Sequence, residues 1–407
     1  MPPRAARSAE RVASWRVRRR VIALALALIV CDQVVQHALI RDGTFFSRRV
    51  APFDPPLFSA EQIESLARVR SGPGRSTAET TFDAELGWCH RPDTDVGEDR
   101  YDWAGARIGV APLEREKRAD RRRIVAIGES FTYGAEVAAA ETWVAGVDRA
   151  RDDLEIANLG VGGYGPDQAL LRLERDGFAL APDEVWLGLV PGTAIRATTL
   201  YVPALRHWFG SVAFKPRFQL DPQGALELVH NPATTPQTLC DLLASQARFL
   251  AALRGHDVWI DRAGEAYSVL GTRWWHHSGL ARLWVTWSER TDREPAPWFE
   301  DPSSELHRLV RAIVLRARDD CSAHHARFRL VLLPESGDLQ FRRETGREYW
   351  RPLLDELRAA GVEVLDATPA LASAGGDTAA ALWAPLGHYS AAGNEIVAAR
   401  VLGALEP

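Results

Sequence analysis

The sequence predicts an α/β domain of three layers, in which helices cover both faces of a mostly parallel sheet. Five short apolar runs, rich in branched side chains, have the length of buried strands. Helix-compatible segments follow most of them, and a repeated strand–helix order makes neighbouring strands parallel. The apolar runs are residues 124–127, 154–159, 184–190, 328–333 and 362–366, and the helical segments are residues 141–151, 166–177, 349–360 and 390–405.

Composition fits a globular protein with a sizeable core. The chain has 407 residues, of which 46% are hydrophobic and 25% charged, so one large domain with extensions or two domains can form. The net charge of −5 gives no case for a nucleic-acid partner.

The N-terminus has the pattern of a membrane anchor. Residues 1–20 carry seven arginines against one acid, Glu10, and residues 21–40 are apolar except for a few polar positions such as Asp32 and Gln36. We expect an uncleaved signal anchor in the inner membrane, with the arginines cytoplasmic and the chain beyond residue 41 periplasmic. The alternatives are a cleaved signal peptide, a lipoprotein cysteine at Cys31 (preceded by Val30, where a small residue is usual) and a buried core helix.

Residues 41–120 are expected to form an irregular connection and a small β-rich preamble. Prolines and glycines interrupt the stretch, and residues 68–81 are polar and linker-like. Short strands are expected near residues 86–88, 101–103 and 108–110.

Cysteines and histidines predict no metal site, and we expect no cofactor. The cysteines are Cys31, Cys89, Cys240 and Cys321, and a Cys240–Cys321 disulfide is possible but cannot be deduced from spacing. The histidine pairs at 276–277 and 324–325 are adjacent, so their members do not share a helix face.

Four positions predict a site at the carboxyl edge of the sheet. Ser130 follows the first strand, Gly163 the second and Thr193 the third, while His388 precedes the last helix. The ends of neighbouring parallel strands meet at one edge, which is where open α/β sheets bind ligands. Ester chemistry needs such a set, namely a nucleophile, a base and oxyanion donors. Taken alone, Ser130 could be a helix N-cap, the glycines tight turns and His388 a residue without a role.

Three blocks together resemble the SGNH (GDSL-like) hydrolase superfamily, in particular its membrane-anchored bacterial members. Residues 128–134 read Gly-Glu-Ser-Phe-Thr-Tyr-Gly, residues 158–165 Asn-Leu-Gly-Val-Gly-Gly-Tyr-Gly, and residues 387–394 Gly-His-Tyr-Ser-Ala-Ala-Gly-Asn. The Leu-Gly-Trp segment at residues 86–88 also fits such members. The resemblance covers roughly residues 120–407. It implies a flavodoxin-like sheet in a domain at residues 121–407.

The resemblance also implies roles for the site residues. Ser130 would be the nucleophile and His388 the general base, while the N–H groups of Ser130 and Gly163, with Thr193, would form the oxyanion hole. Two positions depart from the family pattern, because Thr193 stands where an asparagine belongs and Pro385 and Leu386 where an aspartate belongs. Three groups are candidates to orient the histidine instead: a backbone carbonyl near Pro385, the carboxylate of Asp366 or that of Glu335.

These departures leave several functions open. The first is a serine ester hydrolase acting on an acetyl or short acyl group of an envelope glycan or a small molecule. An acyl transferase would use the same acyl-enzyme. A catalytically impaired domain that binds envelope polysaccharide or a partner protein is the alternative of another class. A dinucleotide-binding domain is disfavoured, because its glycine fingerprint would follow the first strand.

A long insertion is expected at about residues 198–326, between the third and fourth strands. Such an insertion would wall the site. It contains half of the chain's 14 tryptophans, which either stack on sugar rings or pack in a core. Within it we expect a β-hairpin at residues 215–221 and 226–229 and an amphipathic helix at residues 239–254.

Overall fold

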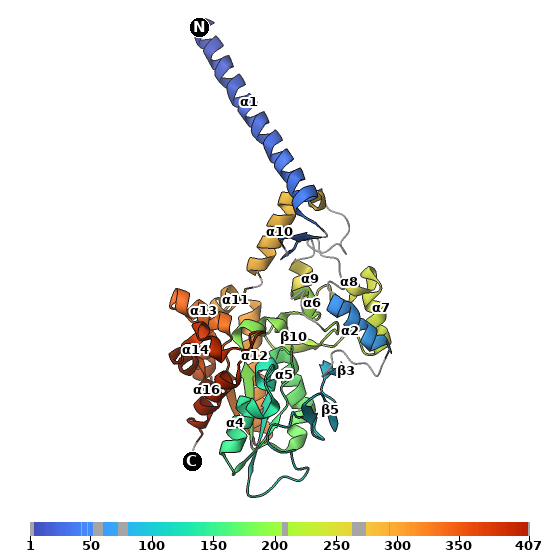
Figure 1. Cartoon of the computed structure of the whole chain (residues 1–407), viewed down its shortest axis with the longest axis vertical. Helices are drawn as coiled ribbons and strands as arrows, with labels where there is room; N and C mark the ends of the chain where they lie inside the picture. Colours follow the sequence, from blue (N-terminus) through green and yellow to red (C-terminus); the bar gives the residue numbers. More distant parts are fainter. Residues whose placement is uncertain are drawn as a thin grey trace. The chain divides into compact units, whose positions relative to one another are not determined.

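A computed structural model describes residues 4–41, 43–46, 48–51, 60–71, 80–205, 211–262, 274–292 and 294–405 (Figure 1). The chain forms two compact units, residues 1–55 with 262–292, and residues 56–261 with 293–407. Part of the long segment expected to be an insertion, residues 262–292, therefore belongs with the N-terminal helix. Most of the linker expected at residues 68–81 lies outside the described residues.

The larger unit contains the predicted parallel sheet. Its strands are β7 (Arg122–Ile127), β8 (Leu154–Asn158), β9 (Glu184–Leu189), β12 (Arg327–Leu332) and β13 (Glu363–Asp366). They pair in the order β13-β12-β9-β7-β8, and every pair is parallel. The predicted strands agree with these bounds to within two residues at each end, and the three-layer α/β fold is confirmed.

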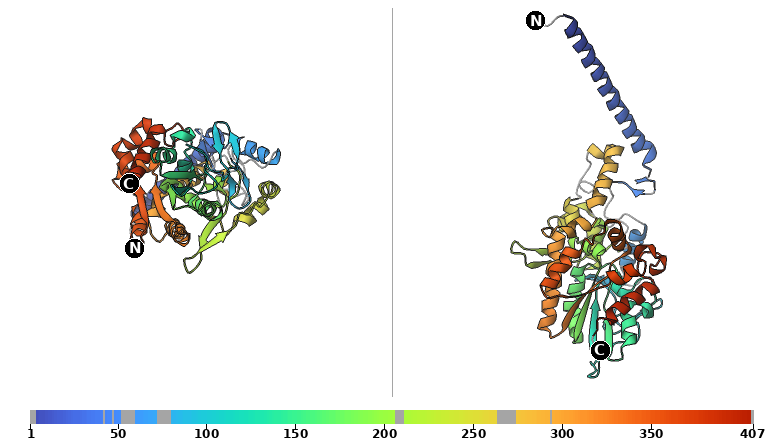
Figure 2. Two further views of the ribbon diagram at one scale, coloured as in Figure 1. Left: turned by 90° about the horizontal axis from the view of Figure 1, so that it is seen from below. Right: turned by 90° about the vertical axis from the view of Figure 1, so that its left-hand side faces the viewer.

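Helices cover both faces of this sheet (Figure 2). Alternate residues of β7 enter two separate cores, as the pleat of a strand requires. Val125 and Ile127 pack with α5 (Pro166–Arg172), α12 (Glu305–Ala323) and α14 (Arg351–Ala359). On the opposite face, Ile124 and Ala126 pack with other helices, namely α4 (Trp143–Ala150), α15 (Thr368–Ser373) and α16 (Ala391–Leu402). Burial on both faces explains why the strands read as unbroken apolar runs.

The strand order fixes where a site can form. Counted along the chain, the sheet runs 2-1-3-4-5, the flavodoxin-like order, so the connections reverse direction between β7 and β9. Ligands of open α/β sheets bind outside the carboxyl ends of the strands at this switch point. Ser130 directly follows β7, and the Gly192–Thr193 turn directly follows β9.

The β-rich preamble is present as two antiparallel ribbons. They are β3 (Thr81–Asp83) with β4 (Gly87–Cys89), and β5 (Thr94–Val96) with β6 (Asp99–Tyr101). Ahead of them the structure has a helix, α2 (Ala60–Ser71), where we expected irregular chain. The prolines that suggested a break lie on either side of this helix, and its Leu66 and Val69 are buried at helical spacing.

The long segment after β9 is only partly an insertion. The expected hairpin is confirmed as β10 (Arg217–Leu220) with β11 (Leu226–Val229). The single helix expected at residues 239–254 is two helices, α7 (Pro236–Leu243) and α8 (Gln246–Leu253), because Ser245 caps the second one by accepting from Arg248 N. The helix α12 belongs to the sheet-covering layer.

Other elements complete this unit. They are α3 (Ser130–Tyr133), α6 (Val202–Leu205), α9 (Val258–Arg262), α11 (Ala296–Glu300), α13 (Ser336–Thr345), a π-helix (Leu173–Gly177) and 3-10 helices at Ala139–Glu141, Phe178–Leu180, Pro191–Thr198, Gly376–Thr378 and Ala380–Leu382.

The smaller unit is built around the N-terminal helix. It contains α1 (Arg4–Val34), a π-helical continuation (Val35–Leu39), the ribbon β1 (Thr44–Phe45) with β2 (Arg48–Arg49), a 3-10 helix (Trp274–His277) and α10 (Gly279–Asp292). Val17–Leu39 is, within the described part of the chain, the one helical stretch long and apolar enough to cross a membrane. Its apolar side chains are mostly exposed, so it is not a core helix of this chain.

The four cysteines are free. Cys31 is exposed and the other three are buried. Cys321 lies in the main core, where burial raises the pKa of its thiol to about 12. The possible Cys240–Cys321 disulfide is therefore not formed in this structure.

Candidate active site

Ser130 begins a one-turn helix at the carboxyl end of β7. The helix is α3, and its N-cap is Glu129, whose carboxylate accepts a hydrogen bond from Phe131 N at 2.8 Å. Ser130 is therefore not the cap, and its hydroxyl is available for other contacts. Only glycine fits at position 128, because a Cβ there would collide with Thr132 Oγ1 and approach the Gly188 carbonyl.

His388 contacts the serine directly. Its Nε2 lies 2.9 Å from Ser130 Oγ, so the structure brings these two predicted residues together across 258 positions of sequence. His388 ends a tight turn in which Gly387, at φ +98°, donates to the Ala384 carbonyl. The ring packs beside Phe131 at 5.0 Å between centroids. These contacts fix the imidazole beside the Ser130 hydroxyl.

Glu136 is the group that orients His388. Its Oε2 lies 2.6 Å from His388 Nδ1, and its carboxylate also accepts from the backbone N–H groups of Leu386 at 2.7 Å and His388 at 3.2 Å. None of the three groups proposed from the sequence takes this place. Asp366 accepts instead from Thr368 N at 2.8 Å.

The backbone at Glu136 is strained. Its φ of +67° is a conformation that residues other than glycine rarely adopt, with a cost of about 1–3 kcal/mol. The three hydrogen bonds of its carboxylate offset that cost. Burial raises the pKa of Glu136, but the hydrogen bonds from Leu386 and His388 outweigh burial and bring it below its ordinary value. The side chain is therefore a carboxylate at neutral pH.

A second carboxylate competes for the proton of Ser130. Ser130 Oγ lies 2.8 Å from Glu129 Oε2, and a hydroxyl has one proton to donate. Arg196 Nη1 lies 3.6 Å from the same Glu129 oxygen. Burial lowers the pKa of Arg196, and the charges of Glu129 and Glu335 oppose that effect. Sequence reasoning did not single out Glu129 or Arg196.

The oxyanion side is less complete than the base side. Gly163 has φ +82°, which favours a residue without Cβ. Its loop is held by the preamble, because Trp88 Nε1 donates to the Gly162 carbonyl at 2.9 Å and Tyr164 donates to the Trp88 carbonyl at 2.6 Å. Thr193 Oγ1 donates to the Val190 carbonyl at 3.3 Å, so its hydroxyl is turned toward its own turn.

A small cavity joins these loops. It has a volume of about 10 Å³, which is close to the space one water molecule needs. Its walls include Glu129, which is next to Ser130, Gly165 of the glycine-rich loop that follows β8 (the glycine loop), and Thr193. The three predicted blocks at the ends of β7, β8 and β9 therefore meet at one place.

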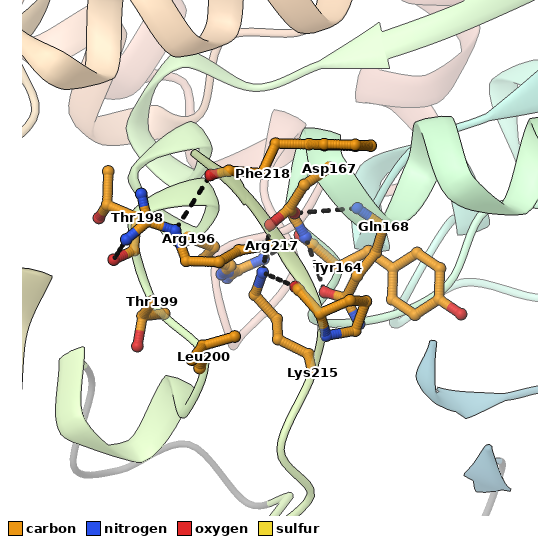
Figure 3. Close-up of polar contacts among 12 residues, drawn as sticks. Tyr164, Asp167, Gln168, Arg196, Thr198, Thr199, Leu200, Lys215, Arg217 and Phe218 are labelled. Atoms are coloured by element: carbon orange, nitrogen blue, oxygen red, sulfur yellow. Dashed lines mark hydrogen bonds and ion pairs between the residues drawn. The ribbon is translucent and has the colours of Figure 1, made fainter. Parts of the chain in front are cut away.

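A buried polar network supports the glycine loop (Figure 3). Lys215 donates to Asp167 in the first turn of α5, and both side chains are fully enclosed. Gln168 Nε2 donates to the Leu86 carbonyl at 2.7 Å, and Arg196 Nη1 donates to the Tyr164 carbonyl at 3.3 Å. These contacts join the loop after β8 to α5 and to the chain around Leu86 and Lys215.

A further acidic pair lies behind the Thr193 turn. Glu335 lies against Gly192, where a Cβ would meet its Oε1 and make the side chain move. Asp338 accepts a hydrogen bond from the Tyr349 hydroxyl, and burial, with the charge of Glu335, raises the pKa of Asp338 well above its ordinary value. Glu335 therefore lies against the loop that follows β9, while Glu136 takes the place beside His388 Nδ1.

The site has the groups for serine nucleophilic catalysis without a metal ligand set. Within the described ranges, no group of three or more His, Cys, Asp or Glu residues could hold a metal ion. The hydroxyl, imidazole and carboxylate of Ser130, His388 and Glu136 stand in the order that a hydrolytic triad requires.

Comparison with known proteins gives similarity at the level of solved structures only. No family model matches the chain, and neither does any curated protein. A member of the lipolytic protein G-D-S-L family from Veillonella parvula is 13% identical, with 69% of this chain and 97% of that chain covered and a TM-score of 0.34. A GDSL-like lipase from Bacteroides thetaiotaomicron is 12% identical over 72% of this chain and 91% of that one, with a TM-score of 0.34.

An acetylxylan esterase from Geobacillus stearothermophilus, solved as a catalytic mutant, is also similar. It is 15% identical over 71% of this chain and 95% of its own, with a TM-score of 0.35. All three TM-scores lie below 0.5, so the functional argument for this chain rests on its own site.

Proposed function

We propose that this chain is a serine ester hydrolase of the SGNH type. The observation that carries the proposal is the chain of hydrogen bonds from Ser130 through His388 to Glu136, at 2.9 Å and 2.6 Å. A serine hydroxyl is a weak nucleophile until an adjacent base takes its proton, and the base works best when a third group fixes its tautomer.

The proposed reaction has two steps. Ser130 Oγ attacks the ester carbonyl while His388 Nε2 accepts the hydroxyl proton, and Glu136 stabilises the imidazolium that forms. Collapse of the tetrahedral intermediate breaks the bond to the alcohol oxygen, which takes the proton from His388. Water then attacks the acyl-serine, His388 again moves the proton, and the carboxylic acid and free serine are regenerated.

The oxyanion is proposed to bind to the N–H groups of Ser130 and Gly163. Thr193 can help only if its hydroxyl turns away from the Val190 carbonyl, to which it now donates. The buried guanidinium of Arg196 adds positive charge near Glu129. This set is weaker than one with a side-chain amide, whose removal typically costs about 10²–10³-fold in rate.

The proposed location is the periplasmic face of the inner membrane. The apolar stretch Val17–Leu39 and the seven arginines before residue 21 support a single-pass anchor with a cytoplasmic N-terminus. An acetyl or short acyl ester on an envelope glycan, or on a small molecule, is the proposed substrate class.

Two alternatives are favoured by a particular observation each. Glu129 competes with His388 for the proton of Ser130, and Thr193 replaces an amide donor, which together favour an impaired domain that binds envelope polysaccharide or a protein. The Ser130–His388 pair serves equally in an acyl transferase, in which a sugar hydroxyl accepts the acyl group in place of water.

Hydrolysis of p-nitrophenyl acetate by the full chain in detergent tests the proposal. We expect activity that Ser130→Ala abolishes and that Ser373→Ala, an exposed serine on α15, leaves unchanged. Equal rates for the wild type and Ser130→Ala would refute the nucleophile. Release of p-nitrophenol without free acetate, when a sugar is supplied, would indicate the transferase.

A further inference from the structure

Two of the polar residues in the apolar stretch Val17–Leu39, Asp32 and Gln36, are bonded to the segment around α10. Asp32 Oδ1 accepts from Ser278 Oγ at 2.7 Å and from Leu280 N at 2.9 Å, so it caps the start of α10. Gln36 Oε1 accepts from Arg282 Nη1 at 3.1 Å. Charged and polar groups inside a membrane span are costly unless they are paired, and here α10 supplies the partners.

The start of α10 lies very close to the end of α1. A Cβ on Gly279 would collide with Gln36 N, so only glycine allows this approach. Arg282 Nε also donates to the Ala51 carbonyl at 2.6 Å, and Ala51 N donates to Thr286 Oγ1 at 2.9 Å. Within this unit, α10 is therefore fixed beside the carboxyl end of the apolar helix (Figure 1).

The other face of α10 is apolar and exposed. Leu280, Trp284 and Trp287 are spaced by four and three residues, so they lie on one face of the helix. Trp284 is 70% exposed and Trp287 74%. Leu283, on the inward face, packs instead against the small core formed by Val35, Ile40 and Val50.

The contacts with Asp32 set the depth of this face. Asp32 precedes Leu39, the end of the apolar stretch, by seven residues, which is about 10 Å along a helix. The whole stretch of 23 residues is about 34 Å long, slightly more than the hydrocarbon core of a bilayer. The partners of α10 move along the chain from Asp32, bonded to Leu280, to Ala51, bonded to Thr286, so α10 runs outward from a point about 10 Å inside the end of the stretch. Trp284 and Trp287 therefore come near the outer edge of the hydrocarbon core, where tryptophan side chains concentrate in membrane proteins.

We propose that α10 is an interfacial membrane helix, docked on the anchor through Asp32, with Trp284 and Trp287 in the headgroup region of the outer leaflet. The occupant of this face is the lipid bilayer, because α10 is bonded to the end of the apolar stretch, whose own apolar side chains are exposed. The inference rests on the proposed membrane anchoring.

A probe at residue 284 tests the inference in the full chain. Cys31 is the exposed cysteine and the other three are buried, so Cys31→Ala with Trp284→Cys gives one site for the environment-sensitive fluorophore NBD. The chain is reconstituted in phosphatidylcholine vesicles that contain lipids spin-labelled near the headgroup or deep in the acyl chain. The matched control is Cys31→Ala with Ser373→Cys, on the exposed surface of α15.

We expect NBD at residue 284 to emit at shorter wavelength and to be quenched several-fold more by the shallow label than the control. Adding Asp32→Ala should reduce that quenching, because α10 loses its cap. Equal quenching at positions 284 and 373 in vesicle-bound chain would overturn the inference while leaving the anchor in place. A short-wavelength signal without quenching would assign the face to a protein contact and overturn it as well. Release of the whole chain from vesicles by alkaline carbonate would refute the anchoring and the inference together.

Discussion

The two halves of the candidate site differ in how completely they are built. On the base side, Ser130, His388 and Glu136 form a continuous hydrogen-bonded chain, and a strained backbone is retained to complete it. On the oxyanion side, Thr193 replaces the expected amide and bonds its own turn. In the proposed mechanism, proton transfer is therefore supported more completely than the charge of the oxyanion.

Removing the base should have the largest effect. We expect His388→Ala to lower kcat/KM for p-nitrophenyl acetate by about 10⁴-fold, the upper range for general acid–base catalysis. The loss should appear in kcat, because His388 acts on the reacting proton. His325→Ala is the control, because His325 is an exposed histidine just before β12 and is not one of the proposed site residues. A loss of kcat/KM below tenfold would mean that His388 does not act as the general base.

Neutralising the orienting carboxylate should come next. We expect Glu136→Gln to lower kcat by about 10³-fold, somewhat less than for the buried aspartate of serine proteases, because Glu136 is partly exposed. Glu136→Asp should recover part of this loss. If Glu136→Gln retains full activity, another group orients His388.

The lowered pKa of Glu136 also predicts a pH dependence of stability. An acid whose folded pKa lies below its ordinary value of 4.5 stabilises the fold above that value. The free energy of unfolding of the wild type should therefore exceed that of Glu136→Gln by a constant amount at neutral pH. The difference should shrink as pH falls from about 4.5 through the folded pKa, measured by urea unfolding. An unchanged difference at the lowest pH would contradict the assignment.

Placing a side-chain amide at position 193 should strengthen the oxyanion hole and raise the rate. We expect Thr193→Asn to raise kcat by about tenfold or more, since side-chain oxyanion donors contribute about 10²–10³-fold where they are well placed. Thr193→Val should change kcat less than about threefold, because the hydroxyl now bonds the Val190 carbonyl. A large loss in Thr193→Val would show that this hydroxyl already serves the oxyanion.

Removing the buried cation should have a modest effect on rate and a clear effect on stability. Arg196→Met removes the buried positive charge that interacts with Glu129 and Glu335. We expect the free energy of unfolding to fall by about 3 kcal/mol, as when one partner of a buried ion pair is lost, and kcat to fall by about tenfold. Arg254→Met, on a loop arginine at the end of α8, is the control. Unchanged stability would mean that Arg196 does not balance these carboxylates.

Most of the sheet could be predicted from the sequence, because strands buried on both faces read as unbroken apolar runs. Ser130, Gly163 and His388 followed from the strand ends and the motif blocks. Glu136 could not be found, because its role depends on a left-handed backbone conformation and on a loop 252 residues away. The contact between α10 and α1 could not be predicted from the sequence either, because Asp32 and Ser278 are 246 positions apart.

Covalent labelling tests whether Ser130 is a nucleophile activated by His388 and Glu136. The full chain is treated with a fluorophosphonate, digested and analysed by mass spectrometry for the peptide that contains Ser130. We expect one adduct, on Ser130, that forms more slowly in Glu136→Gln and is absent in His388→Ala. A folded wild-type chain that forms no adduct, or an adduct that forms equally in His388→Ala, would contradict it.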